Sequence, residues 1–271
     1  MENGTTSEAC GDHRAFLQSK LITSAIVVGL VLAPSAAGAD PSALWRIVHG
    51  SCIPHEEAGK GPEPCETIDL AEGGAEGVAI LKDRIGVAQM LAIPTRRIGG
   101  IEDHRMLQPD APPVFADAWK AKDLVEARLG GNALPREAVA LAINSQYARS
   151  QDQLHVHVDC VAKDVVTTLA EYKSALDDQW RAMMVPLKGR VYFARRLDSK
   201  SLQDQEPLLR LLAEGLPGAK EHMAAMSFAA VGADFGGKPG FVLLADTFSL
   251  EGGGHAEDIQ DHNCEVAHFP P

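Results

Sequence analysis

Residues 153–160, QLHVHVDC, alternate polar and apolar side chains without a break. Such alternation predicts a half-buried β-strand, because successive side chains of a strand point to opposite faces of a sheet. The apolar members would face a core: Leu154, Val156 and Val158. The polar members would share the other face: Gln153, His155, His157 and Asp159. Two imidazoles side by side on a rigid strand suit either phosphorus chemistry or metal binding.

The rest of the chain mixes strands and helices without the strict alternation of a parallel α/β fold. Apolar runs predict strands at residues 78–82, 88–93, 139–144, 154–160, 191–197, 227–231 and 241–245. Helical patterns lie at residues 42–49, 114–129, 206–215, 217–226 and 255–264, with a further apolar stripe from Asp164 to Trp180. We therefore expect a single α+β domain.

The N-terminal part of the chain predicts a targeting segment. Residues 21–33 form an apolar run that is ended by Pro34 and followed by Ala37-Gly38-Ala39. This pattern is typical of a secretory signal peptide, with Asp40 as the first mature residue. The run is shorter than the roughly 20 apolar residues of a membrane-spanning helix. A membrane anchor retained within residues 1–39 stays the alternative, and either reading places the catalytic domain outside the cytoplasm.

The charge of the chain limits the class of partner. The formal net charge at pH 7 is −12. Such a chain is a poor general binder of nucleic acids, because their phosphates repel it. An anionic substrate would need positive charge supplied locally, which directs attention to arginines near the histidines.

Four cysteines follow the predicted targeting segment: Cys52, Cys65, Cys160 and Cys264. An even number in an exported chain favours disulfides, and three pairings are open. A short polar loop rich in glycine and proline separates Cys52 from Cys65, which favours their pairing and leaves Cys160 to pair with Cys264. Four free buried thiols are the alternative.

The loop at residues 144–152, NSQYARSQD, combines a guanidinium, hydroxyls and amides directly before the histidines. Such a concentration of hydrogen-bond donors favours anion binding beside a potential nucleophile. By itself the loop could equally be a solvated hairpin connection. Arg149 is the first candidate for binding a phosphate, followed by Arg97.

The string AINSQYARSQDQLHVHVDC at residues 142–160 resembles the active-site segment of bacterial CDP-diacylglycerol pyrophosphatases, a branch of the histidine-triad superfamily. Further matching strings are LAIPTRRIGGIED, VYFARRL, FVLLA and IQDHNCE, at residues 91–103, 191–197, 241–245 and 259–265. The resemblance implies a histidine-triad-like domain over residues 40–271, with an antiparallel sheet flanked by helices. It also implies hydrolysis of a liponucleotide to CMP and phosphatidate, at the inner membrane or in the periplasm, without cofactor or metal.

The resemblance also implies roles for individual residues. The three triad positions correspond to Gln153, His155 and His157, so a glutamine replaces the first histidine. His155, at the middle position, would attack phosphorus and form a nucleotidyl-histidine, supported by His157. The resemblance places four residues around the phosphates: Asn144, Arg149, Ser150 and Gln151. Gln153 and His262 would support the site indirectly, His262 through a Cys160–Cys264 disulfide.

Two other functions compete with this prediction. His155, His157 and Asp159 resemble the zinc motif of a metallohydrolase, since histidines two residues apart on a strand are good zinc ligands. Against it, Cys160 stands where that motif has a histidine. The second competitor is an exported binding protein without catalysis, in which the histidines only line a ligand cleft.

Overall fold

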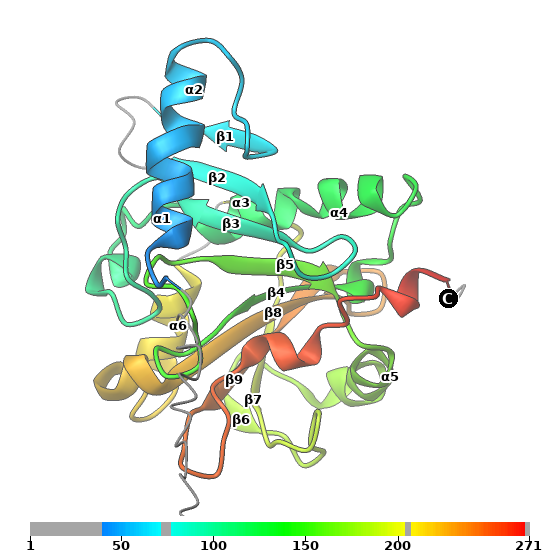
Figure 1. The fold of residues 1–271 in the computed structure, drawn as a ribbon. Coiled ribbons are helices and arrows are strands. Elements are labelled where there is room, and N and C mark those ends of the chain that lie inside the picture. The colour runs from blue at the N-terminus through cyan, green and yellow to red at the C-terminus, as the bar shows by residue number, and fades with distance from the viewer. Residues whose placement is uncertain (1–39, 72–76, 204–206, 269–271) are drawn as a thin grey trace, which may run out of the picture. The chain divides into compact units, whose positions relative to one another are not determined.

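The computed structural model describes residues 40–71, 77–203 and 207–268, and the predicted targeting segment at 1–39 lies outside them (Figure 1). Nine strands of the described residues form one antiparallel sheet. Their order across the sheet is β1 (Thr67–Asp69), β2 (Val78–Lys82), β3 (Met90–Pro94), β5 (Val156–Cys160), β4 (Val139–Ile143), β8 (Met226–Asp234), β9 (Pro239–Thr247), β7 (Phe193–Leu197) and β6 (Arg181–Ala182). The predicted α+β class is confirmed.

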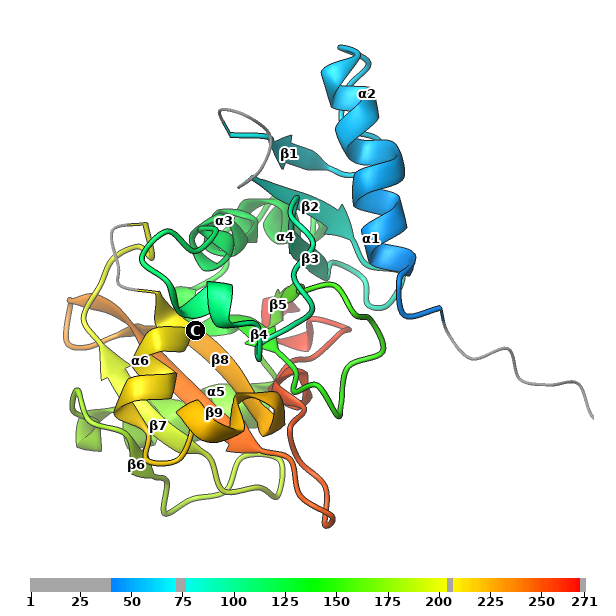
Figure 2. The ribbon, with the colours of Figure 1, turned by 90° about the vertical axis from the view of Figure 1, so that its left-hand side faces the viewer.

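Helices cover both faces of this sheet. The α-helices are α1 (Ala43–Ile47), α2 (Ile53–Glu57), α3 (Val114–Lys120), α4 (Lys122–Arg128), α5 (Lys163–Tyr172) and α6 (Leu208–Gly215). A π-helical turn joins α1 to α2, and short 3-10 turns include η6 (Ala256–Ile259) and η7 (Glu265–His268). Helices α3, α4 and α6 pack on one face, whereas α1 and α5 pack on the other (Figures 1 and 2). Within the described ranges, no helix has the length and apolarity to cross a membrane.

The register of the central strands determines where the histidines lie. β5 runs between β3 and β4, and Leu91 and Ala142 are the cross-strand neighbours of His157. We call the face that carries these three side chains the histidine face. On it, α1 covers β2 and β3, whereas α5 covers β4, β8 and β9. The polar side chains of β5 therefore lie at the seam between two covered regions.

The other side of β5 belongs to the main core. Val156 and Val158 pack there with the apolar faces of α3 and α6. The alternation within QLHVHVDC thus separates the apolar and polar side chains as predicted. The prediction of a half-buried strand is wrong, because every residue from Gln153 to Cys160 is buried. The strand is also shorter than predicted, since residues 153–155 precede β5 and run beside residues 94–98.

The predicted helices have the right places but differ in length. The helix expected at residues 42–49 continues through the π-helical turn and α2 to Glu57, whereas the others are shorter or divided. The helix expected at residues 114–129 is divided at Ala121 into α3 and α4, and the stripe after Asp164 is α-helical only as far as Tyr172. Within residues 255–264 only the short turn η6 is helical. Strands β1 and β6 are absent from the prediction, because three and two residues are too few to show a period.

Both predicted disulfides are confirmed. Cys52 is bonded to Cys65, and Cys160 is bonded to Cys264. The Cys52–Cys65 bond closes the stretch of chain between the helical segment that contains α1 and α2 and strand β1. The second ties the end of β5 to the C-terminal segment, across 104 residues of sequence. It thereby fixes the segment whose η6 packs on the histidine face, through Ala256 and Ile259, and whose η7 packs against the main core, through Val266 and Ala267.

Candidate active site

His155 lies just before β5 and is oriented by the backbone of its own chain. Its Nδ1–H donates to the Gln153 carbonyl oxygen at 2.7 Å, which leaves the lone pair on Nε2. Burial and the neighbouring His157 lower the pKa of His155 to about 4. The imidazole is therefore neutral at pH 7, the state in which Nε2 is a nucleophile.

Gln153, the residue at the first triad position, holds the chain that orients His155. Its side-chain Nε2 donates to the carbonyl oxygens of Pro94, at 3.0 Å, and Arg96, at 2.9 Å. Its Oε1 accepts from the Ile98 N–H at 3.4 Å. Gln153 is fully buried, and its one carboxamide satisfies three backbone groups, two of them in buried contacts. A neutral imidazole has one donor and one acceptor and could not make all three contacts.

Gln153→Glu tests this interpretation. The substitution removes both N–H donors and places a carboxylate against two carbonyl oxygens in a buried site. We expect a loss of about 3 kcal/mol or more in the free energy of unfolding, measured by urea denaturation. Gln146→Glu, the same chemical change at an exposed position of the same loop, should change it by less than about 0.5 kcal/mol. Equal losses in the two variants would contradict the role given to Gln153.

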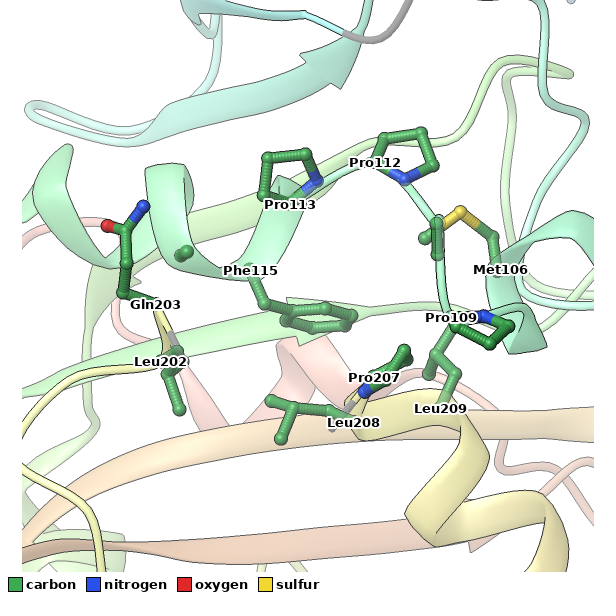
Figure 3. A pocket seen from close by; sticks show the side chains of 12 residues that line it. Met106, Pro109, Pro112, Pro113, Phe115, Leu202, Gln203, Pro207, Leu208 and Leu209 are labelled. Atoms are coloured by element: carbon green, nitrogen blue, oxygen red, sulfur yellow. The ribbon is translucent and has the colours of Figure 1, made fainter. Parts of the chain in front are cut away.

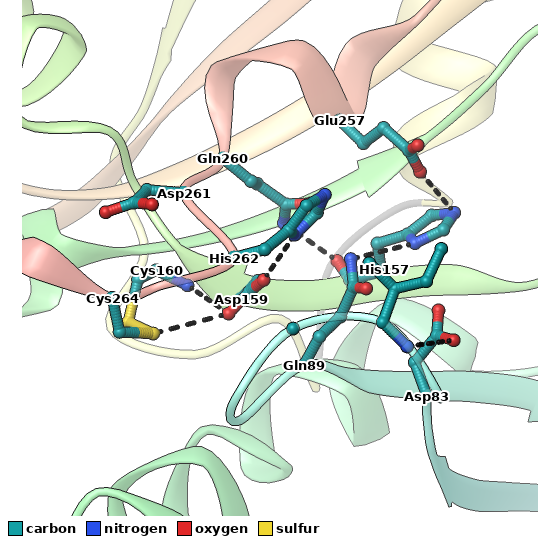
Figure 4. A network of polar contacts seen from close by, with 12 residues as sticks. Asp83, Gln89, His157, Asp159, Cys160, Glu257, Gln260, Asp261, His262 and Cys264 are labelled. Atoms are coloured by element: carbon teal, nitrogen blue, oxygen red, sulfur yellow. Dashed lines mark hydrogen bonds and ion pairs between the residues drawn. A yellow bond between two sulfur atoms is a disulfide. The ribbon is translucent and has the colours of Figure 1, made fainter.

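His157 is held between two side chains from distant parts of the sequence (Figure 4). The Gln89 Nε2 lies 3.1 Å from its Nδ1, and the Glu257 Oε2 lies 2.8 Å from its Nε2. If Gln89 donates to Nδ1, the hydrogen of the neutral ring is on Nε2 and faces the Glu257 carboxylate. The rings of His155 and His157 meet edge to face, with centroids 4.9 Å apart.

Glu257 is a residue of the site that sequence reasoning missed. Its backbone N–H donates to the Asn144 Oδ1 at 3.3 Å, which joins η6 to the end of β4. Burial alone would raise the pKa of Glu257, but the adjacent His157 outweighs it, and the pKa falls to about 2. The carboxylate is therefore ionised at neutral pH. No local pattern singles it out, because it lies 100 residues beyond His157 in a segment without periodicity.

The donor-rich loop reaches the same site, but its arginine is already paired. Arg149 Nη1 and Nη2 donate to the two carboxylate oxygens of Glu102, at 2.6 and 2.8 Å. Asp152 accepts from the same guanidinium at 3.2 Å. Gln151 accepts from the Leu44 N–H at 3.1 Å and so joins the loop to α1. Phosphate binding by Arg149 stays a prediction, and a bound phosphate would share the guanidinium with two carboxylates.

Arg97 and His262 are engaged by residues other than His155 and His157. Arg97 is exposed, lies over the Trp45 ring and donates to the Ser42 hydroxyl at 3.2 Å. His262 does approach β5, as expected from the second disulfide, but its Nδ1 lies 2.8 Å from Asp159 Oδ2 (Figure 4). That hydrogen bond raises the pKa of His262.

The ligands of the zinc alternative are not gathered around one point. Asp159 is engaged by His262 and by the backbone N–H of Cys160. In the described part of the chain, one group of three candidate ligand atoms lies within 4.8 Å of one another, and it consists of Asp159, Cys160 and Cys264. Both sulfurs of that group are in the disulfide. The donor set present therefore does not fit a zinc centre on His155, His157 and Asp159.

A pocket of about 560 Å³ opens over the two histidines, within the usual size of ligand sites. Its polar end consists of His155, His157, Glu257, Asn144, Arg149, Ser150 and Gln151. Lys82, Arg84 and His255 also line it and were not among the predicted residues. The pocket brings together the predicted nucleophile, its neighbour and four predicted phosphate-binding residues from separate segments.

Comparison with known proteins identifies the family of the chain. A family model described as CDP-diacylglycerol pyrophosphatase matches residues 39–268 of the chain. The CDP-diacylglycerol pyrophosphatase of Yersinia pestis is 38% identical over 260 residues, which cover 95% of this chain and 96% of that protein. The matched range includes every residue that lines the pocket.

Proposed function

Since the chain belongs to the CDP-diacylglycerol pyrophosphatase family, we propose that it hydrolyses CDP-diacylglycerol to CMP and phosphatidate through a nucleotidyl-histidine, without a metal. Membership of this family makes the chain a hydrolase of a phosphoanhydride bond. The observation that carries the proposed mechanism is the His155 imidazole, kept neutral by burial and oriented by the Gln153 carbonyl within the pocket.

The reaction proceeds in two displacements at the phosphorus that bears cytidine. In the first, the His155 Nε2 lone pair forms the P–N bond, and the bond to the bridging oxygen breaks. Phosphatidate leaves with that electron pair, and the proton stays on Nδ1, where it is hydrogen-bonded to the Gln153 carbonyl oxygen. In the second, water attacks the same phosphorus, the P–N bond breaks and its electrons return to Nε2. CMP leaves with the water oxygen, and the proton passes to solvent. A covalent intermediate divides one difficult displacement into two easier ones.

The other residues of the pocket position the substrate and spread its charge. His157 lies beside His155 and is fixed from both sides by Gln89 and Glu257. Arg149, Lys82 and Arg84 supply positive charge along the pocket of an otherwise acidic chain. We assign the stabilisation of the equatorial phosphate oxygens to these groups.

We also propose that the domain works outside the cytoplasm, in the periplasm or at the inner membrane. The two disulfides support this, because such bonds persist mainly in oxidising compartments. The apolar run at residues 21–33 supports it too. The intact mass of the chain recovered from cell envelopes would distinguish a cleaved signal peptide from a retained anchor.

The activity and its metal independence are tested in one assay. The purified chain is incubated with CDP-diacylglycerol in detergent micelles, with and without excess chelator, and CMP and phosphatidate are quantified. We expect equal release under both conditions. Loss of activity on chelation that zinc restores would favour the metallohydrolase, and absence of turnover with any nucleoside diphosphate derivative would favour the binding protein.

Glu257→Gln tests the positioning of His157. The amide removes the negative charge that faces Nε2, so we expect kcat to fall by about 100-fold with KM changed little. Glu251→Gln, an exposed position in the same segment, should retain full activity. An active Glu257→Gln enzyme would show that His157 needs no carboxylate partner.

A further inference from the structure

The pocket over the histidines has an apolar side that the chemistry at phosphorus does not use. This side is formed by Leu44 and Ile47 of α1, Leu81 and Leu91 of β2 and β3, and Ile85 of the loop between these strands. We call these five residues the α1 wall. It faces the same cavity as His155 and His157 and is continuous with it.

Ile85 is held at the rim of this wall in an exposed position. Ile85 is 59% exposed, although hydrogen bonds fix its loop. Lys82 Nζ donates to the Gly86 carbonyl at 3.0 Å, and the Ile85 N–H donates to Asp83 Oδ1 at 3.1 Å. The Val87 N–H donates to the His262 carbonyl at 2.9 Å. Together with the other four side chains of the α1 wall, Ile85 offers an apolar surface that a ligand in the pocket can contact.

A second apolar cavity is excluded as the place for this contact. It has a volume of about 150 Å³ and lies between α3 and α6, lined by residues such as Met106, Phe115 and Leu208 (Figure 3). These residues belong to the core on the other side of the sheet, together with Val156 and Val158. A substrate with its phosphorus at His155 would have to pass through the sheet to reach it.

We propose that the α1 wall binds the glycerol backbone and the first part of the acyl chains of the liponucleotide. The proposal rests on the proposed function and identifies the part of the site that recognises the lipid. The histidine end then holds the diphosphate and the wall holds the adjoining apolar groups. A pocket of about 560 Å³ has the size for drug-like ligands, so the chain ends extend past Ile85 into the lipid aggregate.

The experiment compares two substrates that share the diphosphate and differ in acyl chains. Dioctanoyl CDP-diacylglycerol, kept below its critical micelle concentration, carries the chains, and CDP-glycerol lacks them. The variant Ile47→Ser/Ile85→Ser places hydroxyl groups on the wall and adds no charge beside Lys82 and Arg84. We expect kcat/KM for the lipid substrate to fall at least about tenfold, with kcat/KM for CDP-glycerol within twofold of wild type. Val191→Ser, at a β-branched residue that is similarly exposed at 57%, is the matched control.

Each other outcome overturns the proposal in a distinct way. An equal fall for both substrates would assign the two isoleucines to folding or to the polar end. No fall with the monomeric lipid, but a fall with vesicles, would assign Ile85 to membrane docking. If the wild type turned over neither substrate, the proposed function would fail. In that case, binding of dioctanoyl phosphatidate against glycerol 3-phosphate would still report on the wall, and equal affinities in wild type and variant would overturn it.

Discussion

His155→Ala should reduce hydrolysis of CDP-diacylglycerol by at least about 10⁴-fold, the loss expected when a covalent nucleophile is removed. Neither His157 nor Glu257 replaces it, since these two side chains are engaged with each other 2.8 Å apart. The measurement is the initial rate of CMP release from micellar substrate. Rapid quenching at alkaline pH, followed by mass spectrometry, should find CMP on the wild-type chain and none on the variant.

His104→Ala is the matched control, because the His104 side chain is 84% exposed. It should keep wild-type activity and fold. Full activity in His155→Ala would remove the nucleophile from the mechanism. A covalent CMP adduct on another residue would relocate it.

The pH dependence of kcat/KM tests the same assignment of His155 as the nucleophile. The pKa of His155 is lowered to about 4, so at pH 5.5 more than about nine-tenths of the imidazole is neutral, against about one-tenth for a histidine with the ordinary value of about 6.5. We therefore expect kcat/KM to be insensitive to the titration of His155 between pH 7 and 5, and to fall only as the pH approaches 4. An acid limb of the nucleophile at pH 6.5 would contradict the burial argument.

Removal of the Cys160–Cys264 disulfide should destabilise the chain more than removal of any other single cross-link in its described part. In the chain-entropy model, a loop of 104 residues contributes about 4 to 5 kcal/mol, whereas the 13-residue loop closed by Cys52–Cys65 contributes about 3 kcal/mol. Urea denaturation of the two double cysteine-to-serine variants, under non-oxidising conditions, measures the difference.

The longer disulfide should also affect activity, through the position of Glu257. It ties the C-terminal segment to β5, and that segment carries Glu257. At low temperature, where both variants are folded, we expect the Cys160→Ser/Cys264→Ser enzyme to lose activity in parallel with Glu257→Gln. Wild-type activity in that variant would show that Asp159, His262 and the backbone contacts hold η6 in place without the disulfide.

Local sequence patterns were sufficient for a correct prediction wherever a single segment contained all the residues that determine the feature. The alternation in QLHVHVDC separated Val156 and Val158 from His157 and Asp159 correctly, because the side chains of a strand alternate by stereochemistry. The spacing of the cysteines was also informative, since a short polar loop favours a local bond and leaves one pairing for the rest. Apolar runs located the core strands for the same reason.

Contacts between distant segments were beyond such reasoning. Glu257 reaches His157 only because the antiparallel sheet and the second disulfide bring the C-terminal segment over β5. Arg149 was predicted to bind phosphate, yet Glu102, 47 residues earlier, accepts from both of its terminal nitrogens. The burial of β5 on both faces has the same origin, since α3 and α6 pack on one face and η6 brings Glu257 to the other.

The amino-acid sequence by itself determined the family, the α+β class, the disulfide pairing and the two histidines, because each is written in local order, spacing or composition. The tertiary structure decided the protonation state and the orientation of those histidines. Burial and the Gln153 carbonyl make His155 a neutral imidazole with a free Nε2, and Gln89 and Glu257 fix His157. Protonation state and orientation depend on groups that meet only in the folded chain, so a pattern along the sequence cannot contain them.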